Sequence, residues 1–193
     1  MSRVRTGLEA LQARPAALAG LRVGLVAHAA SVTFDLRHAS LALRECPQLR
    51  LVALFGPEHG IRGDAQDLVE VGSSRDPATG VPVHSLYGKT RVPSPAMLAG
   101  LDALVVDLQD VGSRYYTFIY TMLHALEACA RQRLRLVVLD RPNPLGGVAL
   151  EGNLLDPAFT SFVGMHPLPV RHGMTIGELA LLFRAEQIGR AHV

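Results

Sequence analysis

A dense group of titratable side chains follows an apolar run, in the stretch FGPEHGIRGD at residues 55–64. Glu58, His59 and Arg62 come close together there, although a plain turn needs only glycine, asparagine or proline. A glutamate in a partly dry cleft can hold a proton and act as a general acid, which makes Glu58 the first catalytic candidate. The alternative is a structural glutamate at a helix N-terminus. For His59 we expect a structural role or a hydrogen bond to Glu58.

A second polar group lies in DLQDVGSRYYT, at residues 107–117, again directly after an apolar run. Alternation in an extended segment puts Asp107 and Gln109 on one side. One aspartate of this stretch could act with Glu58 as a nucleophile or base. Asp110 could instead cap a helix that begins near Ser113.

Further candidates could bind substrate. Guanidinium groups grip carboxylates in a bidentate way, so the arginines could clamp an anionic group, although each could instead form an internal ion pair, as Arg141 could with Asp140. His172 precedes a helix and could face the same cleft, or be a buried, hydrogen-bonded histidine. The candidate substrate-binding residues are His59, Arg62, Gln109, Arg114, Tyr116, Arg141, Asn143, Arg171 and His172.

The elements that must position these residues are visible as four nearly continuous apolar runs, at residues 21–27, 49–55, 101–108 and 134–140. Such runs are typical of strands buried on both faces of a parallel sheet. Helical patterns lie between them, at 35–46, with Leu36, Ala39 and Leu43 on one stripe, and at 115–132. This order predicts an α/β fold, a Rossmann-like open and mostly parallel sheet with helices on both faces. Ligands bind beyond the carboxyl ends of such strands, which is where the candidates lie.

Two stretches are less regular. Residues 60–97 predict a long excursion with a short strand near 81–87 and a short helix at 95–99. Residues 161–174 could hold another short strand. A final helix should begin at Thr175, because TIGE forms a capping box with Glu178. We expect one catalytic domain over residues 1–187. Residues 188–193, IGRAHV, are expected to be a non-native tail, because one reading frame of a common sequencing adapter encodes them.

Composition excludes several classes of protein. The formal charge of +2 is too small to indicate a nucleic-acid or membrane partner. The two cysteines are far apart, so neither a disulfide framework nor a metal ribbon is expected. GxGxxG, HExxH and GxSxG are absent and YGKT is an incomplete P-loop, so no cofactor is expected. No ligand spacing calls for a metal, although His28, Glu58, His59 and Asp107 could build a site. Without a signal peptide or an apolar span, a cytoplasmic location is the simplest expectation.

Long motifs occur here in a fixed order: LFGPEHGIRGD, TGVPVHSLYG, LVVDLQDVGSRYYTFIYTM, VVLDRPNPLGG, LEGNLLD, SFVG and PVRHGMTIGELA. In these motifs the chain resembles the exo-β-N-acetylmuramidase NamZ family, also known as DUF1343, over about residues 7–187. The family carries asparagine and threonine where this chain has AHAAS, which argues against ligand contacts from His28 or Ser31.

The resemblance implies an exo-acting glycoside hydrolase that releases N-acetylmuramic acid from the non-reducing end of peptidoglycan fragments. It implies a Rossmann-like N-terminal domain, a second domain that is missing here, and a site in the cleft between them. The family's proposed catalytic glutamate, in the PEHG motif, falls on Glu58. The lactyl carboxylate of muramic acid would give the arginines a role.

Three mechanisms stay open for the attack on the anomeric carbon. Asp107 is the first candidate for the second carboxylate, as nucleophile or as base. Catalysis assisted by the substrate's N-acetyl group would need no such partner. The alternatives to a glycosidase are a non-catalytic module that binds a muropeptide or sugar, and a metal-dependent hydrolase.

Overall fold

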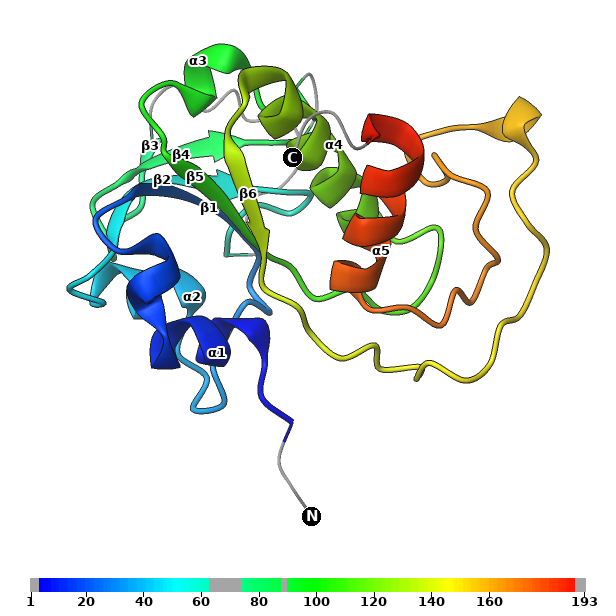
Figure 1. Ribbon diagram of the computed structural model, residues 1–193, viewed down its shortest axis with the longest axis horizontal. Helices are drawn as coiled ribbons and strands as arrows, with labels where there is room; N and C mark the ends of the chain where they lie inside the picture. The colour runs from blue at the N-terminus through cyan, green and yellow to red at the C-terminus, as the bar shows by residue number, and fades with distance from the viewer. Residues whose placement is uncertain (1–3, 63–73, 88–89, 190–193) are drawn as a thin grey trace.

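The protein, seen in a computed structural model that describes residues 4–62, 74–87 and 90–189, is built on one open sheet (Figure 1). The strands are β1 Arg22–Ala27, β2 Arg50–Gly56, β3 Ser74–Arg75, β4 Pro82–Ser85, β5 Ala103–Asp107 and β6 Arg135–Val138. Their order across the sheet is β3-β4-β2-β1-β5-β6. All neighbouring pairs are parallel except β3 with β4. The predicted α/β, Rossmann-like fold is therefore confirmed.

Both faces of the central strands are buried, as their continuous apolar runs predict. Successive residues of β1 and β5 alternate between two cores: Val26 and Val106 belong to one, and Leu25 and Val105 to the other. All four side chains are fully buried. Because neither face of these strands meets water, valine and leucine occupy both, which explains the lack of alternation in the sequence.

Helices cover each face of the sheet (Figure 1). One core includes residues of α1 Gly7–Ala13 and α2 Ala39–Arg44, and the other includes residues of α3 Pro95–Leu98, α4 Phe118–Gln132 and α5 Ile176–Phe183. Shorter turns of helix lie at Pro15–Leu18, Pro157–Phe159 and Arg184–Ile188. In the described part of the chain, no helix is long and apolar enough to cross a membrane.

Three local expectations need correction. Leu36 lies outside α2 at a φ of 62° and is 80 % exposed, so its place on the buried stripe was wrong. The chain turns there because the Thr33 hydroxyl bonds Asp35 and the carbonyl of Arg37, and His38 caps α2. Residues 161–174 form isolated bridges and no strand. Helix α4 begins at Phe118 and not near Ser113, so Asp110 does not cap it.

Other local expectations are confirmed. β4 and α3 lie where a short strand and a short helix were expected. The side chain of Thr175 accepts a hydrogen bond from the backbone of Glu178, whose carboxylate binds the Thr175 backbone in return, so the capping box forms. Of the expected tail, residues 190–193 lie outside the described residues.

The strand order creates a switch point at the carboxyl edge of the sheet. From β1 the chain moves outward to β2 on one side, and it later returns to place β5 on the other side. The segments that follow β2 and β5 therefore diverge around the end of β1, where open α/β sheets bind ligands. A long loop from β6 to α5, drawn in yellow and orange in Figure 1, lies beside the second of these segments, because Arg114 N–H donates to the Val170 carbonyl at 2.8 Å.

Candidate active site

Glu58 follows β2 in a tight turn that the local sequence makes possible. Gly56 has no room for a side chain, since a Cβ there would lie 2.8 Å from the backbone nitrogen of Ile61. The turn closes through a hydrogen bond of 2.9 Å from Gly60 N–H to the Pro57 carbonyl, and His59 and Gly60 have positive φ values of 67° and 73°. Glycine adopts this conformation freely. The turn leaves Glu58 half-buried, and among the described residues it is not part of a helix, unlike the structural alternative considered for it.

The Glu58 carboxylate, which follows β2, accepts a hydrogen bond from a residue in the segment that follows β5. Thr117, at the start of α4, donates its hydroxyl hydrogen to Glu58 Oε2 at 2.8 Å. This hydroxyl forms no hydrogen bond to the helix that it begins, although threonine at this position usually caps its own helix. The described residues provide no second hydrogen bond to the carboxylate, so Oε1 is available to a ligand.

Glu58 lines a cavity of about 520 Å³, which we call the Glu58 cavity. This volume is in the range of small-molecule sites, which are mostly apolar with a few placed polar groups. Four segments form its walls: the turn after β2, the chain after β4, the segment before α4 and part of the long loop. The lining residues are Glu58, His59, Tyr87, Arg91, Tyr115, Tyr116, Thr117, Phe118, Ser161, Phe162 and Val163. One carboxylate among aromatic rings is an arrangement that suits a sugar and an acid-catalysed step.

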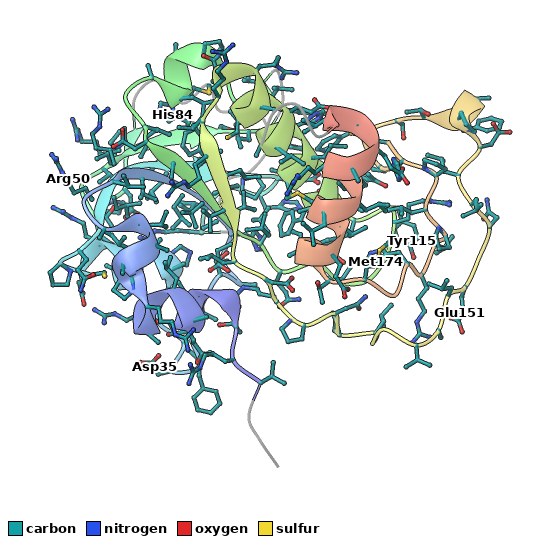
Figure 2. The ribbon with its side chains drawn as sticks, viewed as in Figure 1. Asp35, Arg50, His84, Tyr115, Glu151 and Met174 are labelled. Carbon is teal, nitrogen blue, oxygen red and sulfur yellow. The ribbon has the colours of Figure 1, made fainter. Side chains whose placement is uncertain are left out.

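Tyr116 is an aromatic residue of the cavity wall whose phenol is influenced by nearby carboxylates. Burial raises the pKa of its phenol, and the negative charges of Asp110 and Glu58 add to the rise. Its ring meets Phe118 edge to face, with centroids 4.9 Å apart. Figure 2 shows the neighbouring Tyr115, which is exposed, on the side of the long loop and across the molecule from Arg50 at the start of β2. The cavity therefore lies at the carboxyl edge of the sheet.

Asp107 has a different environment from Glu58. It is fully buried, and its two oxygens accept hydrogen bonds from Arg141 Nε at 2.7 Å and Nη2 at 2.9 Å. Burial raises the pKa of the Asp107 carboxyl, and the Arg141 guanidinium acts in the opposite direction. The expected ion pair of Arg141 with Asp140 was wrong, because Asp140 accepts from the Arg141 backbone and from the Thr175 hydroxyl. Asp107 does not line the Glu58 cavity.

The other predicted arginines also bind protein groups. Arg62 forms an ion pair with the buried Asp76, with Nη2 2.5 Å from Oδ1. Arg114 Nη1 donates to the carbonyls of Asn153 and Leu168, both at 2.6 Å, which fixes the long loop. Arg171 pairs with Glu151 at 3.2 Å and also donates to the Leu145 carbonyl. These guanidinium groups hold the framework together, and none of them lines the cavity.

The remaining candidates bind the backbone near the carboxyl edge. Gln109 donates to the Pro142 carbonyl at 3.1 Å, and Asn143 donates to the Met174 carbonyl at 2.9 Å. His172 is buried: its Nδ1 accepts from Met174 N–H, and its Nε2 lies 3.2 Å from Asp110 Oδ2. Asp110 Oδ1 is buried without a hydrogen-bond partner. Of the predicted site residues, the structure brings only Glu58, His59 and Tyr116 into the wall of the cavity.

Sequence reasoning missed most of the cavity wall. The chain neighbours of Tyr116 also line the cavity, namely Tyr115, Thr117 and Phe118. Their position shortly after a predicted strand could have indicated that they belong to the site. Phe162 lies in the SFVG motif, but nothing marked its side chain as a ligand contact. Arg91 lies in an irregular stretch and carries no signal of its own.

A larger hollow of about 1190 Å³ lies between α4, β6 and α5, and we call it the α4–α5 hollow. Its walls are mainly aliphatic, with Leu126, Leu136 and Leu181 among them. Asp140 and Glu178 also line it, but their carboxylates accept hydrogen bonds from residues at the start of α5. These two carboxylates of the hollow are thus engaged in structure. Among the described residues, no group of three or more His, Cys, Asp and Glu side chains could hold a metal ion.

Comparisons with known proteins agree with this fold. Residues 23–193 match the family described as exo-beta-N-acetylmuramidase NamZ, N-terminal. The peptidoglycan beta-N-acetylmuramidase NamZ of Bacillus subtilis (strain 168) is 52% identical over 185 residues, which are 95% of this chain and 45% of that protein.

Two solved structures of DUF1343 family proteins from Bacteroides fragilis NCTC 9343 are also similar. The first has a TM-score of 0.88 and 46% identity, and the match covers 96% of this chain and 47% of that one. The second has a TM-score of 0.82 and 36% identity, with coverage of 96% and 48%. The chain therefore spans about half the length of the relatives that it matches.

Proposed function

This chain belongs to the NamZ family of exo-β-N-acetylmuramidases, and from that membership we propose that the protein releases N-acetylmuramic acid from the non-reducing end of peptidoglycan fragments. The observation that carries the proposal is the position of Glu58, at the switch point of the sheet and in the wall of an aromatic cavity. The name of the Bacillus relative supports the reaction class and does not favour a non-catalytic sugar-binding module. Our proposal concerns the whole protein, of which this chain matches the N-terminal half.

Glu58 acts as the general acid in this proposal. Its Oε2 is held by Thr117 at 2.8 Å, and its Oε1 delivers a proton to the glycosidic oxygen as the leaving sugar departs. The anomeric carbon gains oxocarbenium character at the same time. Tyr116 and the other rings of the cavity provide flat apolar surfaces against which a pyranose ring can pack.

The attack on the anomeric carbon keeps the open alternatives. A partner carboxylate about 5–5.5 Å from Glu58 would give retention, and one about 6.5–9.5 Å away would give inversion. Asp107 stays a prediction for this role, although Arg141 binds both of its oxygens here. Participation of the substrate's N-acetyl group would need no second carboxylate. A second domain, which the greater length of the relatives makes reasonable, is proposed to form the other wall of the cleft.

The disaccharides of peptidoglycan provide a direct test of the function. The full-length protein should release N-acetylmuramic acid from a disaccharide that has this sugar at its non-reducing end, linked to N-acetylglucosamine. It should not act on the disaccharide with the two sugars in the reverse order. The products can be followed by mass spectrometry. Cleavage of the reverse disaccharide alone, or of neither, would contradict the proposal.

Replacement of Thr117 tests whether Glu58 works in its protonated form. A hydroxyl that donates to a carboxylate stabilises the charged form, so Thr117→Val in the full-length protein removes a stabilising contact of the anion. A group that must be protonated limits the rate at high pH, and we therefore expect the alkaline limb of kcat/KM to move to higher pH. The measurement is the pH–rate profile with a nitrophenyl N-acetylmuraminide.

Thr121→Val is the matched control, because Thr121 lies one turn further along α4 and, among the described residues, its hydroxyl donates to the Thr117 carbonyl alone, at 3.3 Å. It should leave both limbs in place, and Thr117→Ser should restore the original profile. Movement of the acidic limb in Thr117→Val would show that Glu58 works ionised, as a base or nucleophile, against our assignment.

A further inference from the structure

The cation that faces the Glu58 cavity is not one of the four arginines that the sequence suggested. Arg62, Arg114, Arg141 and Arg171 each bind a carboxylate or carbonyl of the protein. Among the described residues, Arg91 is the arginine in the cavity wall. We propose that Arg91 binds the carboxylate of an acidic sugar in the Glu58 cavity and thereby selects N-acetylmuramic acid over neutral hexosamines. This inference rests on the proposed function.

The Arg91 guanidinium lies over an aromatic ring. Its Cζ atom lies 4.1 Å from the centre of the Phe162 ring, which also lines the cavity. Phe162 in turn stacks on His124, with centroids 5.9 Å apart and planes within 4°. A guanidinium over an aromatic face keeps its edge N–H groups directed outward, where they can bind both oxygens of a carboxylate.

The charge of Arg91 is available to a ligand. Arg91 is exposed, and no carboxylate in the described part of the chain forms an ion pair with it. Burial lowers the pKa of His124, and the charge of Arg91 acts in the same direction against the opposing effect of Glu127. A neutral His124 does not compete for an anion. Arg91 therefore offers, within the described part of the chain, a positive charge without a carboxylate partner in the cavity that Glu58 also lines.

The chemistry of the substrate fits this arrangement. N-acetylmuramic acid is N-acetylglucosamine with a lactyl ether on O3, so it carries an additional lactyl group with one negative charge. A site with an acid at one wall and an unpaired guanidinium at another can tell them apart by charge. Loss of such an interaction should appear in binding more than in the chemical step, because the lactyl group does not react.

The test compares an acidic substrate with a neutral one of the same shape. The full-length protein and its Arg91→Gln variant are assayed on nitrophenyl β-N-acetylmuraminide, on the methyl ester of its lactyl group and on the N-acetylglucosamine analogue. We expect Arg91→Gln to raise KM for the acid about 10- to 100-fold, since a charge-assisted bidentate contact is lost, with little change in kcat. Its preference for the acid over the ester should disappear, and Arg91→Lys should restore part of it. Arg131→Gln, an exposed change on α4 outside the cavity, should retain the full preference.

Retention of the preference for acid over ester in Arg91→Gln would overturn the inference. So would a wild-type protein that cleaves the two substrates equally, although the proposed function would then stand. A wild-type protein that cleaves none of the substrates would contradict the proposed function instead. In that case calorimetric titration with N-acetylmuramic acid and N-acetylglucosamine decides the inference: it holds if only the acid binds and Arg91→Gln abolishes that binding, and it fails otherwise.

Discussion

Glu58→Gln in the full-length protein is expected to lower kcat on the natural disaccharide by about 10³-fold or more. Glutamine has the shape of glutamic acid and can still accept the hydrogen bond from Thr117, but it has no proton to deliver to the glycosidic oxygen. General acid catalysis contributes about 10²–10⁴-fold, and a sugar leaving group depends strongly on it. KM should change little, because the cavity wall is otherwise intact. Release of N-acetylmuramic acid, followed by mass spectrometry, measures the loss.

The leaving group separates an acid from other roles of Glu58. Nitrophenolate leaves without much protonation, so Glu58→Gln should lose less activity on the nitrophenyl substrate than on the disaccharide. Glu151→Gln makes the same chemical change at an exposed carboxylate that does not line the cavity, and it should keep normal activity on both substrates. Equal losses on the two substrates would contradict the acid role, and near-normal turnover on both would contradict any catalytic role.

The second large effect is on stability, at the buried pair of Asp107 and Arg141. Asp107→Asn leaves the Arg141 guanidinium buried without a charged partner, and we expect the free energy of unfolding to fall by about 3–5 kcal/mol. Urea unfolding of the full-length protein measures it. The double change Asp107→Leu with Arg141→Met should be less harmful than the single one, because it removes the unpaired charge together with its partner.

An exposed ion pair provides the control for this stability test. Arg22 and Asp102 lie 3.3 Å apart with side chains 46% and 37% exposed, and Asp102→Asn should move the unfolding midpoint far less. The same Asp107→Asn protein tests the predicted catalytic role of Asp107. A variant that keeps its stability but has a kcat reduced more than 100-fold would show that Asp107 acts in the reaction. It would also show that the ion pair with Arg141 contributes little to stability.

The sheet could be predicted because its signal is local. Val105 and Val106 face opposite cores, so an unbroken apolar run already indicates a strand buried on both sides. Such runs alternated with helical patterns, which sets the α/β order and the edge that carries Glu58. The start of α2 was predicted too early, at residue 35. Leu36 adopts a left-handed conformation, so the helix begins only at Ala39.

Partners of charged groups could not be predicted, because they depend on which segments meet in space. Arg141 follows Asp140 in the chain but pairs with Asp107, 34 positions away, which the sequence does not indicate. Thr117 looks like an ordinary helix cap until the fold brings the turn after β2 against it. Arg91 is recognisable only by its place over Phe162. The edge of the site was thus predictable, and most of its wall was not.

The most direct test of the central claim is a crystal structure of the full-length Glu58→Gln protein with the disaccharide bound. Our account predicts the N-acetylmuramic acid ring in the cavity beside Tyr116 and Phe162. The glycosidic oxygen should lie about 2.6–3.2 Å from the side-chain amide at position 58. A disaccharide bound in the α4–α5 hollow, or with its glycosidic bond out of reach of position 58, would contradict it.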